Sequence, residues 1–137
     1  MAAGFTNAGL NHILSTEFCS GTQVTTWYLG LINNSPSPTF STADILSSHA
    51  GWTETTAYSG NRKAWTNGAA ASQATTNSST VDFAISGTVT VYGLFLCTAS
   101  SGTSGTLELT ASFSGGTQAV ASGDTLQSTL TVSAASG

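Results

Sequence analysis

Charge is the property that this sequence lacks most clearly. Only 6% of its 137 residues are charged, and its two cations, Arg62 and Lys63, are neighbours in a chain of net charge −4. Proteins that bind nucleic acid or anionic membrane surfaces need several Lys or Arg residues to attract phosphates. We therefore expect neither nucleic acid nor a membrane as a partner.

Signals for export or membrane insertion are also missing. No basic residue precedes the first apolar positions, and no uninterrupted apolar run approaches the roughly 20 residues that span a bilayer. We expect synthesis in the cytosol and hence two reduced cysteines, Cys19 and Cys97. Cys97 ends an apolar run, where a free cysteine usually acts as a small core residue.

Residues that could carry catalysis are few and scattered. The only histidines are His12 and His49, and no Gly-x-Ser-x-Gly sequence surrounds a serine. The six acids occur singly, without the spacing of a calcium loop or a local carboxylate pair: Glu17, Asp44, Glu54, Asp82, Glu108 and Asp124. We predict no catalytic, cofactor-binding or metal-binding site, and so no enzyme. A hydrolase whose site is assembled from distant residues is the third and weakest hypothesis.

Enough apolar material is present for one folded domain. Hydrophobic residues make up 39% of the chain and include three Trp, three Tyr and six Phe, which disordered chains rarely contain. No shift in composition marks a second domain. We therefore predict a single domain over residues 1–137.

One segment, about residues 5–18, has helical periodicity. Its apolar residues recur at helical spacing and would form one stripe: Leu10, Ile13, Leu14 and Phe18. Thr6 or Asn7 can cap the start, and Gly21 follows the end. We interpret this helix as a cover over one end of a sheet; the alternative is an arm docked on a neighbouring molecule.

The rest of the chain alternates between short strand patterns and turns. Strands are expected at 25–32, 52–56, 62–66, 81–85, 88–97, 107–113 and about 126–132. A short helical turn is expected at 41–47, and residues 67–80 are expected to be a long polar loop. Such a pattern is typical of a mostly β protein, here an antiparallel β-sandwich or jelly-roll-like domain with a short N-terminal helix.

Strand 25–32 is largely apolar on both faces. In strand 88–97 one face would hold Val89, Val91, Gly93, Phe95 and Cys97, and the opposite face changes from polar to apolar halfway along. Gly30 and Gly93 would mark bulges or close approaches of another backbone. Both strands should therefore be covered, either by the N-terminal helix or by a partner molecule. The candidate partner contacts are Tyr28, Ile32, Tyr92, Leu94 and Leu96.

A cluster of aromatic and charged residues occupies the two strands expected at 52–56 and 62–66, with a turn at 58–61. Pairing of these strands would bring together Trp52, Glu54, Arg62 and Trp65. Arg62 could pair with Glu54 or stack on an indole ring. We favour a structural corner in which the Trp side chains fill the core; the alternative is a platform for carbohydrate.

Several segments carry a family resemblance through their order along the chain. They are Trp27-Tyr28-Leu29-Gly30-Leu31-Ile32, Ala50-Gly51-Trp52-Thr53-Glu54, Tyr58, Arg62-Lys63-Ala64-Trp65, Val81-Asp82-Phe83, residues 89–96, Gly105-Thr106-Leu107 and residues 120–126. Together they resemble small bacteriophage virion proteins, described as capsid cement or head decoration proteins and in other cases as tail-fibre proteins. The resemblance implies a β-sandwich or jelly-roll fold and contains no catalytic residues.

The resemblance implies a structural protein present in many copies on the virion. A compact chain without repeats, coiled coil or shaft favours a capsid cement protein, which binds and stabilises the assembled head. Its expected partners are the major capsid protein and copies of itself, as a dimer or trimer. The expected location is the capsid surface, after synthesis in the host bacterial cytoplasm. The alternative is a tail-fibre or carbohydrate-binding β-sandwich module that recognises a host glycan.

Overall fold

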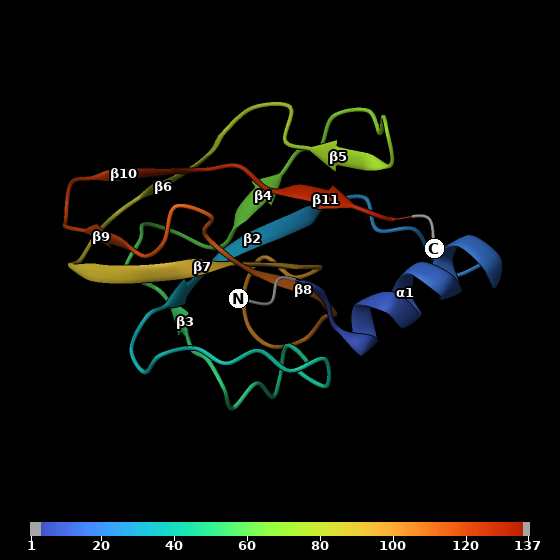
Figure 1. Cartoon of the computed structure of the whole chain (residues 1–137), viewed down its shortest axis with the longest axis horizontal. Helices are drawn as coiled ribbons and strands as arrows, with labels where there is room; N and C mark the ends of the chain where they lie inside the picture. Colours follow the sequence, from blue (N-terminus) through green and yellow to red (C-terminus); the bar gives the residue numbers. More distant parts are fainter. Residues whose placement is uncertain (1–3, 136–137) are drawn as a thin grey trace.

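The computed structural model of the protein describes residues 4–135 and shows a mostly β molecule with one helix at its edge (Figure 1). In chain order the elements are β1 (Gly4–Phe5), α1 (Asn7–Phe18), β2 (Trp27–Asn33), β3 (Glu54–Thr55), β4 (Lys63–Trp65), β5 (Ala74–Thr76), β6 (Val81–Ala84), β7 (Val89–Cys97), β8 (Leu107–Ser112), β9 (Gln118–Val120), β10 (Thr125–Ser128) and β11 (Thr131–Ser133). All strand pairs among these residues are antiparallel. No helix within this range is long and apolar enough to cross a bilayer.

The strands form one large sheet and a smaller second layer. The large sheet has the order β1-β8-β7-β2-β3, with β4 also paired to β2 and β9 to β7. The second layer consists of β6 paired with β10 and β5 paired with β11. These two pairs follow one another along the same two chain segments, 74–84 and 125–133, and we call them the ribbon (Figure 1). Within residues 4–135 the sheets stay open at their edges.

Each face of the large sheet has its own hydrophobic cluster. On one face, Leu29 and Leu31 of β2 pack with Phe83 of the ribbon. On the other face, Ile32 packs with Trp52 beneath segment 34–52. Figure 1 shows the ribbon and this segment on opposite sides of β2 and β7. This double cover explains why the central strands are apolar on both faces, as predicted.

A bulge in β7 changes the predicted sharing of faces. Ile32 pairs with Gly93 and the next residue, Asn33, pairs with Val91, so that Tyr92 is skipped. Beyond the bulge, Leu94 lies on the same face of the sheet as Val91. Strict alternation along the strand had placed these two residues on opposite faces. The sequence prediction for Gly93 is confirmed, because a Cβ there would lie 2.0 Å from the carbonyl oxygen of Ala111.

Several predicted elements differ from the observed ones. The segment expected as a polar loop contains β5, and the turn at 41–47 forms without a helix, although the Ser41 N–H donates to Asp44 Oδ2 as a capping pair would. β3 and β4 both pair with β2 instead of with each other, so the predicted pairing of strands 52–56 and 62–66 is wrong. The chain does bend at 59–61, where Gly60 has a φ of 79°. Cys19 and Cys97 are both free thiols, as predicted, the first exposed and the second buried.

Candidate interaction surface on the N-terminal helix

The start of α1 is fixed to β8 by hydrogen bonds. Thr6 caps the helix, because its hydroxyl accepts a hydrogen bond from the Gly9 N–H at 3.0 Å and donates to the carbonyl of Leu107. The Thr6 N–H also donates to the carbonyl of Glu108 at 3.0 Å. The predicted cap therefore orients the helix as well as starting it.

Gly9 decides which side of α1 faces the sheet. A Cβ at this position would lie 2.2 Å from the backbone oxygen of Glu108, so only glycine permits this close approach. Glycine is unfavourable inside a helix, yet at this position it lets the helix backbone come close to β8. Gly9 and His12 both lie on the side of the helix that meets the sheet, so the opposite side turns outward.

The outward side carries most of the predicted apolar stripe. Leu10 is 46% exposed, Leu14 is 53% exposed and Phe18 is 80% exposed. Ile13, which lies closer to the sheet, is half-buried. The helix does lie against the sheet at β8, as the sequence interpretation expected, but the exposed residues of the apolar stripe do not make that contact. We call Leu10, Leu14 and Phe18 the α1 stripe; exposed apolar side chains gathered on one helix are typical of an interaction surface.

A pair of titratable groups, the half-buried His12 of α1 and the buried Glu108 of β8, lies where the helix meets the sheet. His12 Nδ1 is 3.3 Å from Glu108 Oε2, and the Glu108 side chain is only 4% exposed. The two atoms are not aligned as a hydrogen bond and neither has another partner within residues 4–135. His12 also packs edge-on against Trp27, with ring centres 5.6 Å apart. Burial without a hydrogen bond raises the pKa of Glu108 to about 7.

This carboxyl makes stability depend on pH. Its pKa is about 7 in the folded protein and near 4.5 in the unfolded chain, so folding favours the protonated form. The stability that the protonated carboxyl contributes to the fold is fully present below pH 4.5 and is lost as the pH rises through 7. We expect the free energy of unfolding to fall by on the order of 3 kcal/mol over this range, and Glu108→Gln to remove most of the fall. Urea titrations at a series of pH values measure it.

The matched control for this prediction is Glu17→Gln, because Glu17 is exposed on the same helix. The control variant should keep the pH dependence of the wild type. An unchanged pH dependence in Glu108→Gln would contradict the assignment to the buried carboxyl.

The predicted partner contacts lie elsewhere and are mostly internal. Ile32, Leu94 and Leu96 are buried in the two clusters, and Tyr28 and Tyr92 are half-buried beside the second. The ribbon and segment 34–52 cover these positions, not the helix. The prediction that Ile32, Leu94 and Leu96 contact a partner is wrong, because long-range packing within the chain already covers them.

The aromatic corner is structural, as predicted, but it is not one cluster. Trp52 and Trp65 are 1% and 6% exposed and belong to clusters on opposite faces of the large sheet. Arg62 Nε donates to Glu54 Oε1 at 2.9 Å, and its Nη2 donates to Glu54 Oε2 at 2.6 Å. Buried indole rings cannot form a carbohydrate platform, so that alternative is wrong for this pair.

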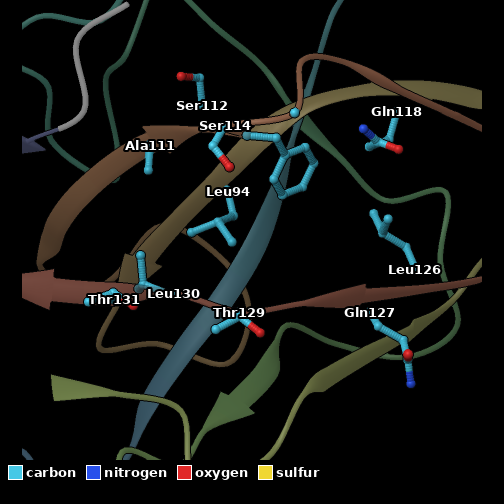
Figure 2. Close-up of a pocket in the computed structure, with 12 residues that line it drawn as sticks. Leu94, Ala111, Ser112, Ser114, Gln118, Leu126, Gln127, Thr129, Leu130 and Thr131 are labelled. Atoms are coloured by element: carbon cyan, nitrogen blue, oxygen red, sulfur yellow. The ribbon is translucent and has the colours of Figure 1, made fainter.

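A groove separates β8 from the ribbon (Figure 2). Its volume is about 540 Å³, and Leu94 of β7 lies between its two walls. No charged side chain lines it; the lining residues are Leu94, Ala111, Ser112, Phe113, Ser114, Gly115, Gln118, Leu126, Gln127, Thr129, Leu130 and Thr131. Sequence reasoning missed this groove, because it forms between strands that are distant in the chain.

Comparison with known proteins identifies no relative of this chain. The chain matches no model of a known protein family, and a search of curated proteins finds no match. Within residues 4–135, no three His, Cys, Asp or Glu side chains meet in an arrangement that could hold a metal ion. The exposed α1 stripe and the uncharged groove are the features that suggest contact with another molecule.

Proposed function

We propose that this chain is a structural protein of a bacteriophage virion, a capsid cement or decoration protein that binds and stabilises the assembled head shell. The observation that carries the proposal is the α1 stripe, with Phe18 80% exposed at its end. Covering such an apolar surface with a partner removes it from water, which favours association. The major capsid protein is the proposed partner, with copies of this chain beside it.

The surface chemistry supports permanent assembly. With 6% of residues charged, the surface repels neighbouring copies weakly, and contacts must come from apolar burial and neutral hydrogen bonds. Such contacts depend little on salt, because ions screen only charges. The large sheet with the ribbon over one face supports the finer proposal of an open β-sandwich.

The second candidate, a tail-fibre or glycan-binding module, has lost its main support. It depended on accessible indole rings, and both Trp52 and Trp65 are internal. Trp27 is half-buried and packs against His12, which leaves no set of coplanar exposed rings among these three residues. We therefore rank it below the cement protein.

The α1 stripe can be tested directly on particles. Leu10→Ser, Leu14→Ser and Phe18→Ser together should leave folding intact but abolish decoration of head shells assembled without the protein. Shells without the protein should form and then rupture at lower temperature, since a protein that binds only the assembled shell stabilises it by linkage. Adding back the wild type should restore resistance even in high salt. Sedimentation of shells and a thermal rupture assay give the measurements.

The matched control is Ile45→Ser, because Ile45 is 44% exposed but lies on segment 34–52 and is not part of the α1 stripe. The control variant should decorate shells like the wild type. Normal decoration by the triple variant would contradict the role of the stripe. Depleted particles that are equally robust but fail to adsorb to cells would replace the cement role with receptor binding.

A further inference from the structure

The ribbon has one paired edge and one open edge along residues 125–133. Three hydrogen bonds fix which way its backbone faces: from the Ile85 N–H to Asp124 O (2.8 Å), from Asn77 Nδ2 to Ser128 O (2.9 Å) and from the Leu130 N–H to Asn77 Oδ1 (2.8 Å). The backbone N–H and C=O groups of the even-numbered residues therefore point toward β5 and β6. Because successive strand residues direct their N–H and C=O groups to alternate sides, the odd-numbered residues face the other way. No strand among residues 4–135 pairs with them there.

This open edge carries none of the usual protection. Natural proteins guard edge strands with Lys, Pro, bulges or inward charges, because an unpaired edge attracts other strands. Residues 125–133 (Thr-Leu-Gln-Ser-Thr-Leu-Thr-Val-Ser) contain no charge, no Pro and no Gly. Nine unguarded residues are a liability unless a strand pairs with them.

The open edge faces the groove already described (Figure 2). A second cavity of about 290 Å³ shares Ala111, Leu130 and Thr131 with the first and continues the groove to Gly4 and Ser133. No charged side chain lines either cavity. At roughly 3.3 Å per residue, the nine-residue edge is about 30 Å long. The groove therefore accompanies most of the open edge.

The geometry points to a strand-binding groove that takes an extended, uncharged arm of a different polypeptide. The arm lies between β8 and the ribbon and pairs with the odd-numbered residues of 125–133, as a third strand of the second layer. Its alternate side chains are small or medium apolar groups that pack against the half-buried Ala111, which lines both cavities. Backbone hydrogen bonds supply affinity and the side-chain positions supply selectivity, as in other cases of strand addition.

The arm comes from a different protein and not from a second copy of this chain. Every strand within residues 4–135 is already paired in the molecule's own sheets, so a copy could offer the edge of a sheet but not a free strand. A groove between two layers also admits a single strand more readily than the edge of a packed sheet. The neutral lining selects a neutral arm, because a buried charge would find no partner there.

The experiment uses the whole protein and an acetylated, amidated peptide, Thr-Val-Ser-Val-Gln-Val-Ser-Val-Thr, as the probe. Calorimetric titration should show saturable binding, and the peptide should slow amide hydrogen exchange at Gln127, Thr129 and Thr131. Thr129→Pro removes one outward N–H without breaking a bond to β5 or β6, and it should weaken binding about tenfold. A peptide with Pro at alternate positions should not bind.

A second variant keeps the test decisive if Thr129→Pro fails to fold. Ala111→Phe fills the groove and should block the peptide, whereas Ala64→Phe, at an exposed position on β4, should not. Binding that neither groove variant changes, or no binding at all, would overturn the inference. So would self-association of the protein through this edge, or binding of maltoheptaose in place of the peptide. The groove shares no residue with the α1 stripe, so loss of shell decoration in the stripe variant bears on the proposed function alone.

Discussion

Replacing Trp52 by alanine should lower the free energy of unfolding by about 3–5 kcal/mol, as for other large buried side chains. Trp52 is 1% exposed, stacks on His49 with ring centres 3.8 Å apart and packs against Phe95 at 5.1 Å. Its Nε1–H donates to Asp44 Oδ2 at 3.0 Å. The substitution leaves a cavity and also removes a hydrogen bond from the buried Asp44 carboxyl. Urea unfolding followed by circular dichroism measures the change.

Two controls separate this structural role from a binding role. Trp27→Ala removes the same side chain from a half-buried position and should cost clearly less. The native emission of Trp52, isolated in a variant whose other two indoles are replaced by Phe, should be blue-shifted and poorly quenched by acrylamide. Solvent-like emission, with a Trp52→Ala variant that folds normally and loses glycan binding, would restore the carbohydrate hypothesis.

The local pattern of the sequence predicted most elements, since each depends on residues close in the chain. The helix, its Thr6 cap and the central strands β2 and β7 appear nearly where periodicity placed them. Periodicity could also tell that both faces of these strands are covered. It could not tell which segments cover them, because the ribbon is built from residues about fifty positions apart.

The candidate surface was misjudged for a related reason. An apolar stripe on a helix ordinarily faces the core, but here a single glycine, Gly9, sets the close contact and turns Leu10, Leu14 and Phe18 outward. Likewise the bulge beside Gly93 moves Leu94 to the face that the ribbon covers. In both cases backbone proximity decides the outcome, and the spacing of apolar residues does not encode it.

The Arg62–Glu54 pair is the one strong ionic contact that sequence reasoning foresaw. The guanidinium makes two hydrogen bonds to the carboxylate, a third to the carbonyl of Ala99 at 3.1 Å, and lies 5.1 Å from the centre of the Phe95 ring. Arg62 is 7% exposed. Its contacts join the residue before β4 to Glu54 of β3, to Phe95 of β7 and to Ala99 just after β7. Nearby Tyr58 has a raised pKa because of burial and the adjacent Glu54 carboxylate.

Removing either partner of this pair alone should therefore destabilise the fold more than removing both. Arg62→Ala leaves the Glu54 carboxylate beside Tyr58 without its counterion, and should lower the free energy of unfolding by about 3 kcal/mol, the low end for buried pairs. The low end applies because the Glu54 side chain is 22% exposed. Arg62→Lys should recover only part of the loss, since an ammonium group cannot form the paired hydrogen bonds.

The double variant Arg62→Met and Glu54→Leu should be more stable than Arg62→Ala, because no charge is left unpaired. A double-mutant cycle measured by urea unfolding gives the coupling; losses from the two single variants that simply add would show that the pair contributes through packing alone.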